Sequence, residues 1–327
     1  MNTHRYTNIY ETERKKINKI LSDALKKRKP VTLYEPGSYI LNSRGKRLRP
    51  LLVLLSAKAV GGEYKDAYNA AAAVEMLHNF TLVHDDIMDN ADKRRGRITL
   101  HKKYDHNTAI LTGDSLLSIA YEYLLKDCNG NAKEVVSSFT HGLIEVCEGQ
   151  SLDTDFESRK NVSLSEYIIM IKKKTAAMAE MCCKIGAVLG GGNKIQVNAL
   201  GNYGLNLGIA FQIQDDLLDI SADEKKFGKT IGGDLVEGKK TFLFLEALEK
   251  SKGEERKKLL KVIERKGIRR NQVLSYKQIY EKLGVLDDAQ RQIRLFTKKA
   301  LNSLKSLGEE NSKIFVWLAD SLINRTS

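Results

Sequence analysis

The sequence predicts an all-α protein, and three observations support this fold class. Apolar residues recur with helical periodicity through most of the 327-residue chain. The three prolines are Pro30, Pro36 and Pro50, so no proline interrupts a helix after residue 50. No long segment alternates apolar and polar residues in the way that is typical of a strand. We also find no shift in composition that would mark a domain boundary, so we expect a single domain over residues 1–327.

The individual helices are predicted from apolar spacing and from signals at their ends. Proline suits the first turn of a helix and paired glycines end one, so a buried helix follows Pro50 and stops at Gly61-Gly62. A capping box at 163–166 starts another. In chain order, we expect helices at residues 9–30, 51–60, 67–89, 108–127, 133–157, 163–189 and 193–220, and then four or five shorter helices between 241 and 324.

Three segments between the helices are predicted to be connectors. The first contains Pro36 and Gly37, and the second is the glycine run 190–192. The third, residues 222–240, is rich in Gly and Lys and is predicted to be an ordered loop over a site. Arg94-Arg95-Gly96-Arg97 is predicted to end the long helix before it.

The composition sets limits on partners and location. The formal net charge is +13, but Lys and Arg are spread in short runs without a nucleic-acid-binding motif, so we expect no nucleic-acid partner. The four cysteines and six histidines show no metal-binding spacing, which is typical of free thiols in a reducing compartment. The polar N-terminus and the short apolar runs predict no signal peptide and no transmembrane segment, and hence a cytoplasmic protein.

Two copies of one acidic pattern are the strongest functional signal in the chain. They are Asp85-Asp86-Ile87-Met88-Asp89 and Asp215-Asp216-Leu217-Leu218-Asp219. Residues four apart share a helix face, so the first and last aspartates of each copy project together. Such carboxylates repel each other unless cations lie between them, and Mg²⁺ takes one or two carboxylates plus substrate phosphates. One copy alone is more often a solvated helix face, whereas two copies in apolar stretches predict a magnesium-diphosphate site.

Basic residues that could bind phosphate oxygens lie beside both acidic motifs. Arg matches pairs of phosphate oxygens and Lys supplies a point charge. Any one of these residues is more often a surface charge, and it is their placement that favours phosphate binding. They are the turn at 45–50, Arg94-Arg95, Lys174-Thr175, Lys229 and Lys239.

Together these motifs resemble those of the trans-isoprenyl diphosphate synthases, the farnesyl/geranylgeranyl diphosphate synthase (polyprenyl synthetase) family. The resemblance runs from about Tyr39 to Thr241 and is fainter beyond. It implies the isoprenoid synthase bundle, with long helices around a central cavity, usually in a homodimer. The motifs that carry it are GKRLRP (45–50), EMLHNFTLVHDDIMDNADKRRGRITLH (75–101), TGD (112–114), EGQSLD (148–153), KT (174–175), FQIQDDLLDISAD (211–223) and FGKTIGGDLVEGKKT (227–241).

The resemblance also implies roles for the matching residues. Three Mg²⁺ ions would be bound directly by Asp85, Asp89 and Asp215, with support from Asp86, Asp216 and Asp219. The allylic diphosphate would contact Arg94, Lys174, Thr175, Gln212, Lys229 and Lys239. Isopentenyl diphosphate would contact Lys46, Arg49, His78 and Arg95. Gln150 and Asp153 resemble positions beside the metal cluster. The residues expected to be catalytic are Asp85, Asp89, Asp215, Arg94, Lys174 and Lys229.

The implied reaction condenses isopentenyl diphosphate with an allylic diphosphate, which is dimethylallyl, geranyl or farnesyl diphosphate. Cations would neutralise the leaving diphosphate, and the allylic carbon–oxygen bond would then ionise. The double bond of isopentenyl diphosphate would attack the carbocation, and a proton would leave to the departing diphosphate. Apolar helix walls would keep out the water that quenches such a cation.

Product length is predicted from the helix that leads into Asp85. One helical turn rises about 5.4 Å, near the length of one prenyl unit, so a bulky residue one turn back would form a floor. Phe80, five residues before Asp85, is the bulky candidate, and Leu77 and Thr81 flank it. One aromatic at this position resembles archaeal-type geranylgeranyl diphosphate synthases, whose product has twenty carbons. Alternatively, Phe80 is an ordinary core residue.

Other functions remain open from the sequence. Farnesyl diphosphate is the second candidate product, and a longer polyprenyl diphosphate is a third. A terpene cyclase also uses an aspartate-rich motif, but its second metal motif usually contains Asn, Ser or Thr with Glu. A non-catalytic subunit of a synthase commonly lacks one acidic motif, whereas this chain has both. A basic helical protein that binds nucleic acid is the remaining alternative.

Overall fold

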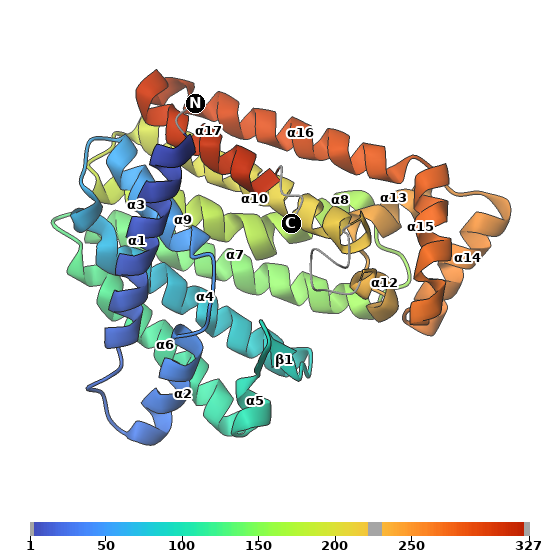
Figure 1. Ribbon diagram of the computed structural model, residues 1–327, viewed down its shortest axis with the longest axis horizontal. Helices are drawn as coiled ribbons and strands as arrows, with labels where there is room; N and C mark the ends of the chain where they lie inside the picture. Colours follow the sequence, from blue (N-terminus) through green and yellow to red (C-terminus); the bar gives the residue numbers. More distant parts are fainter. Residues whose placement is uncertain (1–2, 222–230, 324–327) are drawn as a thin grey trace. The chain divides into compact units, whose positions relative to one another are not determined.

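The computed structural model describes residues 3–221 and 231–323, which are almost entirely helical (Figure 1). The only sheet in these residues is a hairpin of β1 (Lys93–Arg94) and β2 (Arg97–Ile98). The segment η2 (Lys172–Ala176) is a π-helix. The α-helices are α1 Thr3–Asp23, α2 Val31–Leu41, α3 Leu48–Ala59, α4 Tyr68–Met88, α5 Leu100–Lys103, α6 His106–Lys126, α7 Ala132–Ser158, α8 Leu164–Ile171, α9 Ala177–Leu189, α10 Lys194–Ser221, α12 Gly233–Glu237, α13 Phe242–Lys250, α14 Gly253–Arg265, α15 Val273–Lys282, α16 Val285–Ser303 and α17 Glu309–Ile323.

The chain divides into two compact units. The first unit comprises Met1–Thr140, Met181–Gly201 and Ser306–Ile314. The second comprises His141–Glu180, Asn202–Lys305 and Phe315–Ser327. The first acidic motif belongs to the first unit and the second motif to the second, so each half of the candidate site is described within its own unit.

In the first unit, the core forms around α4. This helix packs against α6, α3 and α1, and its residues 70–73, all alanine, are fully buried. The side chain of Gly113 in α6 is a single hydrogen, and an added Cβ there would lie 2.6 Å from Nε2 of His84 in α4. Small residues therefore let neighbouring helices approach closely around α4.

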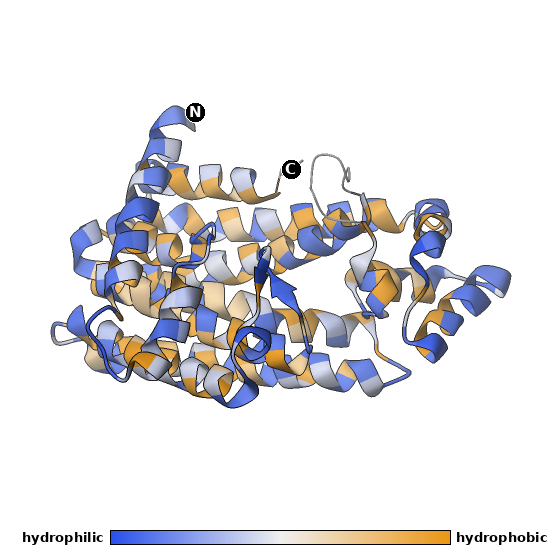
Figure 2. Ribbon diagram, turned by 60° about the horizontal axis from the view of Figure 1, so that its bottom comes forward, coloured by the Kyte–Doolittle hydropathy of each residue, from blue (hydrophilic) through white to orange (hydrophobic). Residues whose placement is uncertain are grey.

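In the second unit, α13 is the most buried element. Its residues 242–245 are all buried, and they share one cluster with Ile213 and Leu217 of α10 and with Tyr167 of α8. The element α13 contacts α8, α14, α15 and α16. Figure 2 shows hydrophobic and hydrophilic residues in alternating stripes along the helices, which is the pattern of amphipathic helices that pack around a core.

Most predicted helices are present with shifts of a few residues at their ends. Pro50 lies in the first turn of α3, as predicted, and Gly61-Gly62 follow its end. The capping box predicted at the start of α8 is confirmed: the Ser163 side chain accepts a hydrogen bond from the Glu166 backbone N–H, and the Glu166 carboxylate accepts from the Ser163 backbone N–H. The predicted helix at 163–189 contains α8, η2 and α9 in succession.

The prediction of a connector at Pro36 and Gly37 was wrong. Both residues lie inside α2 and are buried. Proline in a helix interior removes a hydrogen bond and is costly, which is why the sequence indicated a break. Tertiary packing outweighs this cost, because α2 packs on α6 and an added Cβ at Gly37 would lie 2.8 Å from Cδ1 of Leu25.

The predicted loop at 222–240 is only partly a loop. Residues 222–230, which include Lys229, lie outside the described residues. The remainder contains the short helix α12, which is flanked by Gly232 and Gly238 with φ angles of +73° and +71°. Five residues are too few to show helical periodicity, so the sequence could not distinguish this turn from a loop.

No helix in the described part of the chain is long and apolar enough to cross a membrane.

The close contact of α9 with α3 predicts a large effect of one methyl group. An added Cβ at Gly186 would lie 2.1 Å from the carbonyl oxygen of Val53, which is backbone and cannot move aside. We expect Gly186→Ala to lower the free energy of unfolding by about 1–3 kcal/mol, measured by urea denaturation.

The matched control is Gly201→Ala. Its Cβ would meet only the flexible side chain of Lys184, at 2.7 Å. Because alanine favours helix over glycine by about 1 kcal/mol, this variant should be as stable as the parent or slightly more stable. Equal effects of the two substitutions would contradict the assignment of a backbone contact at Gly186.

Candidate active site

The first acidic motif lies at the C-terminal end of α4. Asp85 is half-buried, and Asp89 is exposed and follows the last residue of the helix. Asp86, by contrast, is 3% exposed, and its Oδ1 accepts a hydrogen bond from Nε of Arg94 at 2.6 Å. Burial raises the pKa of Asp86, although the guanidinium of Arg94 opposes the shift. The middle aspartate is therefore held by the protein, while the outer two face the surface.

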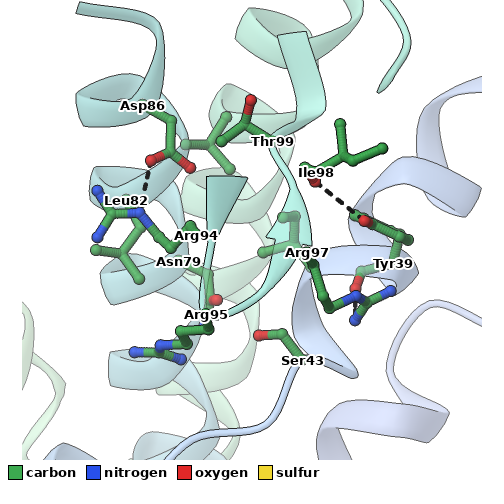
Figure 3. Close-up of a pocket in the computed structure, with 12 residues that line it drawn as sticks. Tyr39, Ser43, Asn79, Leu82, Asp86, Arg94, Arg95, Arg97, Ile98 and Thr99 are labelled. Carbon is green, nitrogen blue, oxygen red and sulfur yellow. Dashed lines mark hydrogen bonds and ion pairs between the residues drawn. The ribbon is translucent and has the colours of Figure 1, made fainter. Parts of the chain in front are cut away.

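The hairpin after this motif places Arg94 and Arg95. Its turn residues, Arg95 and Gly96, have φ angles of 52° and 77°, as a two-residue type I′ turn requires. Figure 3 shows the result: Arg94 extends to Asp86, the Arg95 side chain lies on the same side of the hairpin, and Arg97 lies on the other side against Tyr39. The hairpin was predicted only as a helix break, because strands of two residues leave no alternating pattern.

The basic turn before α3 is organised around one buried arginine. Arg47 adopts a left-handed backbone conformation with φ 50°, and its guanidinium donates to Glu75 Oε1 at 2.6 Å. It also donates to Asn18 Oδ1 and to the backbone oxygens of Leu41 and Ser43. Both side chains of the Arg47–Glu75 pair are 3% exposed. These bonds fix the turn from inside, so that Lys46 is exposed and Arg49 is the second residue of α3.

Arg49, His78 and Arg95 come together beside this turn. The Nη1 atom of Arg49 donates a hydrogen bond to Nε2 of His78 at 3.2 Å. Burial, and then the charge of Arg49, hold the pKa of His78 well below its ordinary value, so the ring is neutral and can accept this bond. Arg95 donates to the backbone oxygen of Arg44, and a Cβ added at Gly45 would lie 2.9 Å from its Nη1. Three of the four residues predicted to contact isopentenyl diphosphate therefore form one cationic cluster.

The second acidic motif shows the same division between its aspartates. Asp215 is exposed, whereas Asp216 is 5% exposed. Asp216 accepts hydrogen bonds from the Tyr167 hydroxyl, the Phe242 backbone N–H at 3.0 Å and the Gln212 amide at 3.1 Å. Burial raises the pKa of Asp216 to about 6 despite these donors. It also raises the pKa of Tyr167 well above the usual value, so the hydroxyl keeps its proton and remains a donor.

Asp219, the last residue of this motif, holds the start of α12. Its carboxylate accepts from the backbone N–H groups of Gly233 and Asp234 at 3.2 and 3.1 Å, and its carbonyl accepts from Gly232. A carboxylate suits the N-terminal end of a helix, where backbone N–H groups are unpaired. The next residue after α12 and Gly238 is Lys239, whose ammonium lies 3.9 Å from Asp234. Asp219 thereby fixes the segment that presents Lys239.

Asp234 is a site residue that sequence reasoning missed. Burial, and then the negative charges of Asp219 and Asp216, raise its pKa to about 7. Its side chain is 28% exposed, so solvent reaches it in part. A carboxyl group with this pKa is about half protonated near neutral pH, and it carries its full charge only above that range.

Lys174 and Thr175 lie in the π-helical segment η2. A Cβ added at Gly149 of α7 would lie 2.2 Å from the backbone nitrogen of Lys174, and one at Gly208 of α10 would lie 2.6 Å from Cα of Ala176. Glycines on two helices therefore make room for the wider turn, a feature often found at functional sites. Lys174 is ion-paired with Asp153, and Thr175 donates to Gln212 Oε1 at 3.0 Å.

The carboxylates suit a hard divalent cation, because they provide oxygen ligands only. Within residues 3–221 and 231–323, no group of three His, Cys, Asp or Glu side chains is close enough to hold a metal ion by itself. One or two carboxylates with waters and phosphate oxygens are sufficient for Mg²⁺. The first aspartate of each motif is half-buried (Asp85) or exposed (Asp215), and the middle aspartates are buried and accept hydrogen bonds from protein groups.

The residues predicted to set product length lie on α4. The ring of Phe80 is half-buried and packs edge-on against the ring of His84, with centroids 4.6 Å apart. Leu77 is 1% exposed and belongs to the core, and Thr81 donates its hydroxyl to the backbone oxygen of His78. Phe80 and Thr81 are both partly exposed, and of these two Phe80 has the larger side chain.

Sequence reasoning identified the aspartates of both motifs, including the supporting ones, but did not single out Arg47, Glu75 or Tyr167. Arg47 was within a recognised motif, and Glu75 was a single charge in an otherwise apolar stretch of α4, which was a signal for a buried ion pair. Tyr167 gave no signal, because a tyrosine at a helical core position is usual.

Comparisons with known proteins agree with this picture. The family model described as polyprenyl synthetase matches residues 30–283. The chain belongs to the polyprenyl synthetase family. It has the all-α isoprenoid synthase fold that we predicted, and it is a trans-prenyltransferase. Enzymes of this family use a divalent metal and act on isoprenyl diphosphates.

Individual relatives cover most of the chain. A geranylgeranyl diphosphate synthase of Sulfolobus acidocaldarius is 40% identical over 300 residues, which are 90% of this chain and 91% of that one. A geranylfarnesyl diphosphate synthase of Natronomonas pharaonis is 42% identical over 250 residues, 71% of this chain and 73% of that one. The crystal structure of geranylgeranyl pyrophosphate synthetase from Pyrococcus horikoshii has a TM-score of 0.90 at 35% identity and covers 98% of each chain.

The buried Arg47–Glu75 pair gives a prediction about stability. Removing the charge of Glu75 leaves the Arg47 guanidinium buried without its counter-ion, so we expect Glu75→Gln to lower the free energy of unfolding by about 3 kcal/mol. The double variant Arg47→Met, Glu75→Leu removes both charges and should regain most of that loss. Urea denaturation of the three proteins tests this, and a single variant as stable as the parent would show that the pair does not support the turn.

Proposed function

We propose that this chain is a short-chain trans-prenyltransferase that condenses isopentenyl diphosphate with allylic diphosphates, and that its main product is geranylgeranyl diphosphate. The observation that carries the proposal is the arrangement common to both acidic motifs. In each, the middle aspartate is buried and hydrogen-bonded, while the first is less buried: Asp85 is half-buried and Asp215 is exposed. Relatives that are named geranylgeranyl diphosphate synthases support the product.

In this proposal, each half of the site binds through a different set of groups. Asp85, Asp89 and Asp215 bind Mg²⁺ directly, in a cluster of three ions, and Asp86, Asp216 and Asp219 hold these ligands and the adjoining segments in place. Bound Mg²⁺ supplies positive charge that neutralises the leaving diphosphate. Isopentenyl diphosphate is bound by the cationic cluster around Arg49, since guanidinium groups match phosphate oxygens. The proposed contacts are Arg49, His78 and Arg95 of this cluster, together with Lys46 of the turn before α3.

The allylic diphosphate is bound by Arg94, Lys174, Thr175, Gln212, Lys229 and Lys239. Lys174 and Gln212 are oriented before substrate binds, by Asp153 and by Asp216. A fixed orientation lowers the reorganisation needed as charge develops on the leaving group. Lys229 lies outside the described residues, so its role rests on the sequence motif.

The side chains of α4 shield the reacting carbons. When the allylic bond ionises, the apolar groups of Leu77 and Phe80 exclude water from the hydrocarbon chain. The neutral ring of His78 and the guanidinium groups around it offer no strong base. The proton lost in the last step therefore goes to the departing diphosphate.

The proposal is tested by incubating the purified chain with Mg²⁺, labelled isopentenyl diphosphate and, in separate reactions, dimethylallyl, geranyl and farnesyl diphosphates. A twenty-carbon alcohol after dephosphorylation supports it. Asp85→Asn should lower the rate at least about a hundredfold, whereas Asp92→Asn, an exposed neighbour outside the motif, should not. A product of fifteen or twenty-five carbons would keep the reaction and correct its length. Cyclisation without isopentenyl diphosphate would indicate a cyclase, and no reaction would favour a non-catalytic subunit.

Phe80→Ala should lengthen the product. Removing the ring opens the path along α4 by about one turn, 5.4 Å, so we expect products of twenty-five carbons or more to exceed the twenty-carbon product. Thr81→Ala, one position along, removes little volume and should leave the length unchanged. An unaltered product in Phe80→Ala would show that Phe80 is a core residue and not the floor.

A further inference from the structure

The hairpin of α14 and α15 is a separate structural feature from the candidate active site. The two helices lie side by side in opposite directions at the right-hand end of Figure 1. An ion pair joins Lys282 at the end of α15 to Glu255 at the start of α14, and the Tyr276 hydroxyl donates to the backbone oxygen of Lys258. We call residues 252–282 the basic hairpin.

The basic hairpin holds more than half of the net charge of the protein. It contains eleven Lys and Arg and four Glu, a net charge of +7, compared with +13 for all 327 residues. Basic side chains near an anionic surface each strengthen binding roughly fivefold. About a tenth of the chain thus has more than half of its net charge. Solubility of a helix face does not require so many uncompensated charges.

The charge is greatest at the connection between the two helices, which contains no acidic residue from 265 to 274. Arg265, Lys266, Arg269 and Arg270 are all exposed there. Among the described residues, no carboxylate lies within ion-pair distance of these four, although Lys257 and Lys282 elsewhere in the hairpin are paired. The connection therefore presents uncompensated positive charge to a partner.

Apolar side chains accompany this charge. Leu274, in the first turn of α15, is 64% exposed, and Leu260 on the outer face of α14 is 39% exposed between Lys257 and Lys261. Exposed leucines beside Lys and Arg are typical of surfaces that enter the boundary between lipid headgroups and acyl chains.

We propose that the basic hairpin docks the protein on an anionic lipid bilayer, with Arg265, Lys266, Arg269 and Arg270 on the headgroups and Leu274 inserted beside them. Nucleic acid would satisfy the positive charge but would leave Leu274 exposed to water. An anionic bilayer satisfies both, because it offers negative headgroups above an apolar interior.

Docking on a bilayer would also place the enzyme where its product collects. This supporting argument rests on the proposed function. A twenty-carbon chain partitions strongly from water into a bilayer, since each CH₂ group adds to the preference. The connection of the hairpin also touches the segment that carries Lys239: a Cβ added at Gly238 would lie 2.6 Å from the carbonyl carbon of Lys266. The docking surface thus lies directly beside one predicted part of the active site.

The experiment measures sedimentation of the full chain with vesicles of phosphatidylcholine alone or with 40% phosphatidylglycerol. We expect binding only to the anionic vesicles. The variant Arg265→Gln, Lys266→Gln, Arg269→Gln, Arg270→Gln should bind them at least about tenfold more weakly. The matched control, Lys15→Gln, Lys19→Gln, Lys133→Gln, Lys194→Gln, loses the same charge from exposed positions elsewhere and should bind as the parent does. Leu274→Ser should weaken binding several-fold.

The outcomes separate this proposal from the proposed function. Prenyl transfer in solution, without vesicles, should be the same in the parent and in the quadruple variant of residues 265, 266, 269 and 270. Inactivity of the parent chain in that assay would count against the proposed function and would leave the docking proposal unaffected. The docking proposal would be overturned if the parent did not bind anionic vesicles, or if the quadruple variant and its matched control lost the same amount of vesicle binding. Tighter binding to duplex RNA than to vesicles at equal phosphate concentration, with no effect of Leu274→Ser, would assign the surface to nucleic acid.

Discussion

The mutual repulsion of aspartates within each acidic motif is the constraint on which the site depends. A helix that ends in two or three carboxylates is unfavourable unless some of them are neutralised or hydrogen-bonded. The chain resolves this in the same way twice. Asp86 accepts a hydrogen bond from a guanidinium of the following hairpin, and Asp216 accepts from a hydroxyl of α8, an amide of its own helix α10 and a backbone N–H of α13. The less buried aspartates are the ones that we propose for binding cations.

The neutralising partners are also what position the neighbouring segments. Arg94 ties the hairpin to α4, Phe242 begins α13 at Asp216, and Asp219 begins α12. A buried charged pair also positions the basic turn before α3: the Arg47–Glu75 pair organises the turn that exposes Lys46. Arg94 and Lys174 are likewise each paired with a carboxylate, and Arg95 donates to a backbone oxygen.

The fold and the outward part of the site could be predicted from the sequence, because long helices and repeated acidic motifs leave strong local patterns. The partners of the supporting aspartates could not be predicted in this way. Pro36 in α2 and the five-residue α12 contradict or escape local rules, and both are decided by tertiary packing. Tyr167 and Asp234 are ordinary residues by spacing, and they matter only because folding brings them to Asp216 and Asp219. A pattern along the chain records which face a residue occupies but not which distant group it meets.

The wide turn at Lys172–Ala176 has a consequence for how such a chain can diverge over time. The π-helical turn holds one more residue than an α-helical turn, and Gly149 and Gly208 on the flanking helices leave the space for it. The wide turn and the two glycines depend on one another, since a larger residue at either glycine would meet backbone. Among homologous genes, we therefore expect the wide turn and both glycines to be kept together or lost together. Three sites spread over sixty codons are then constrained as one in how they can change.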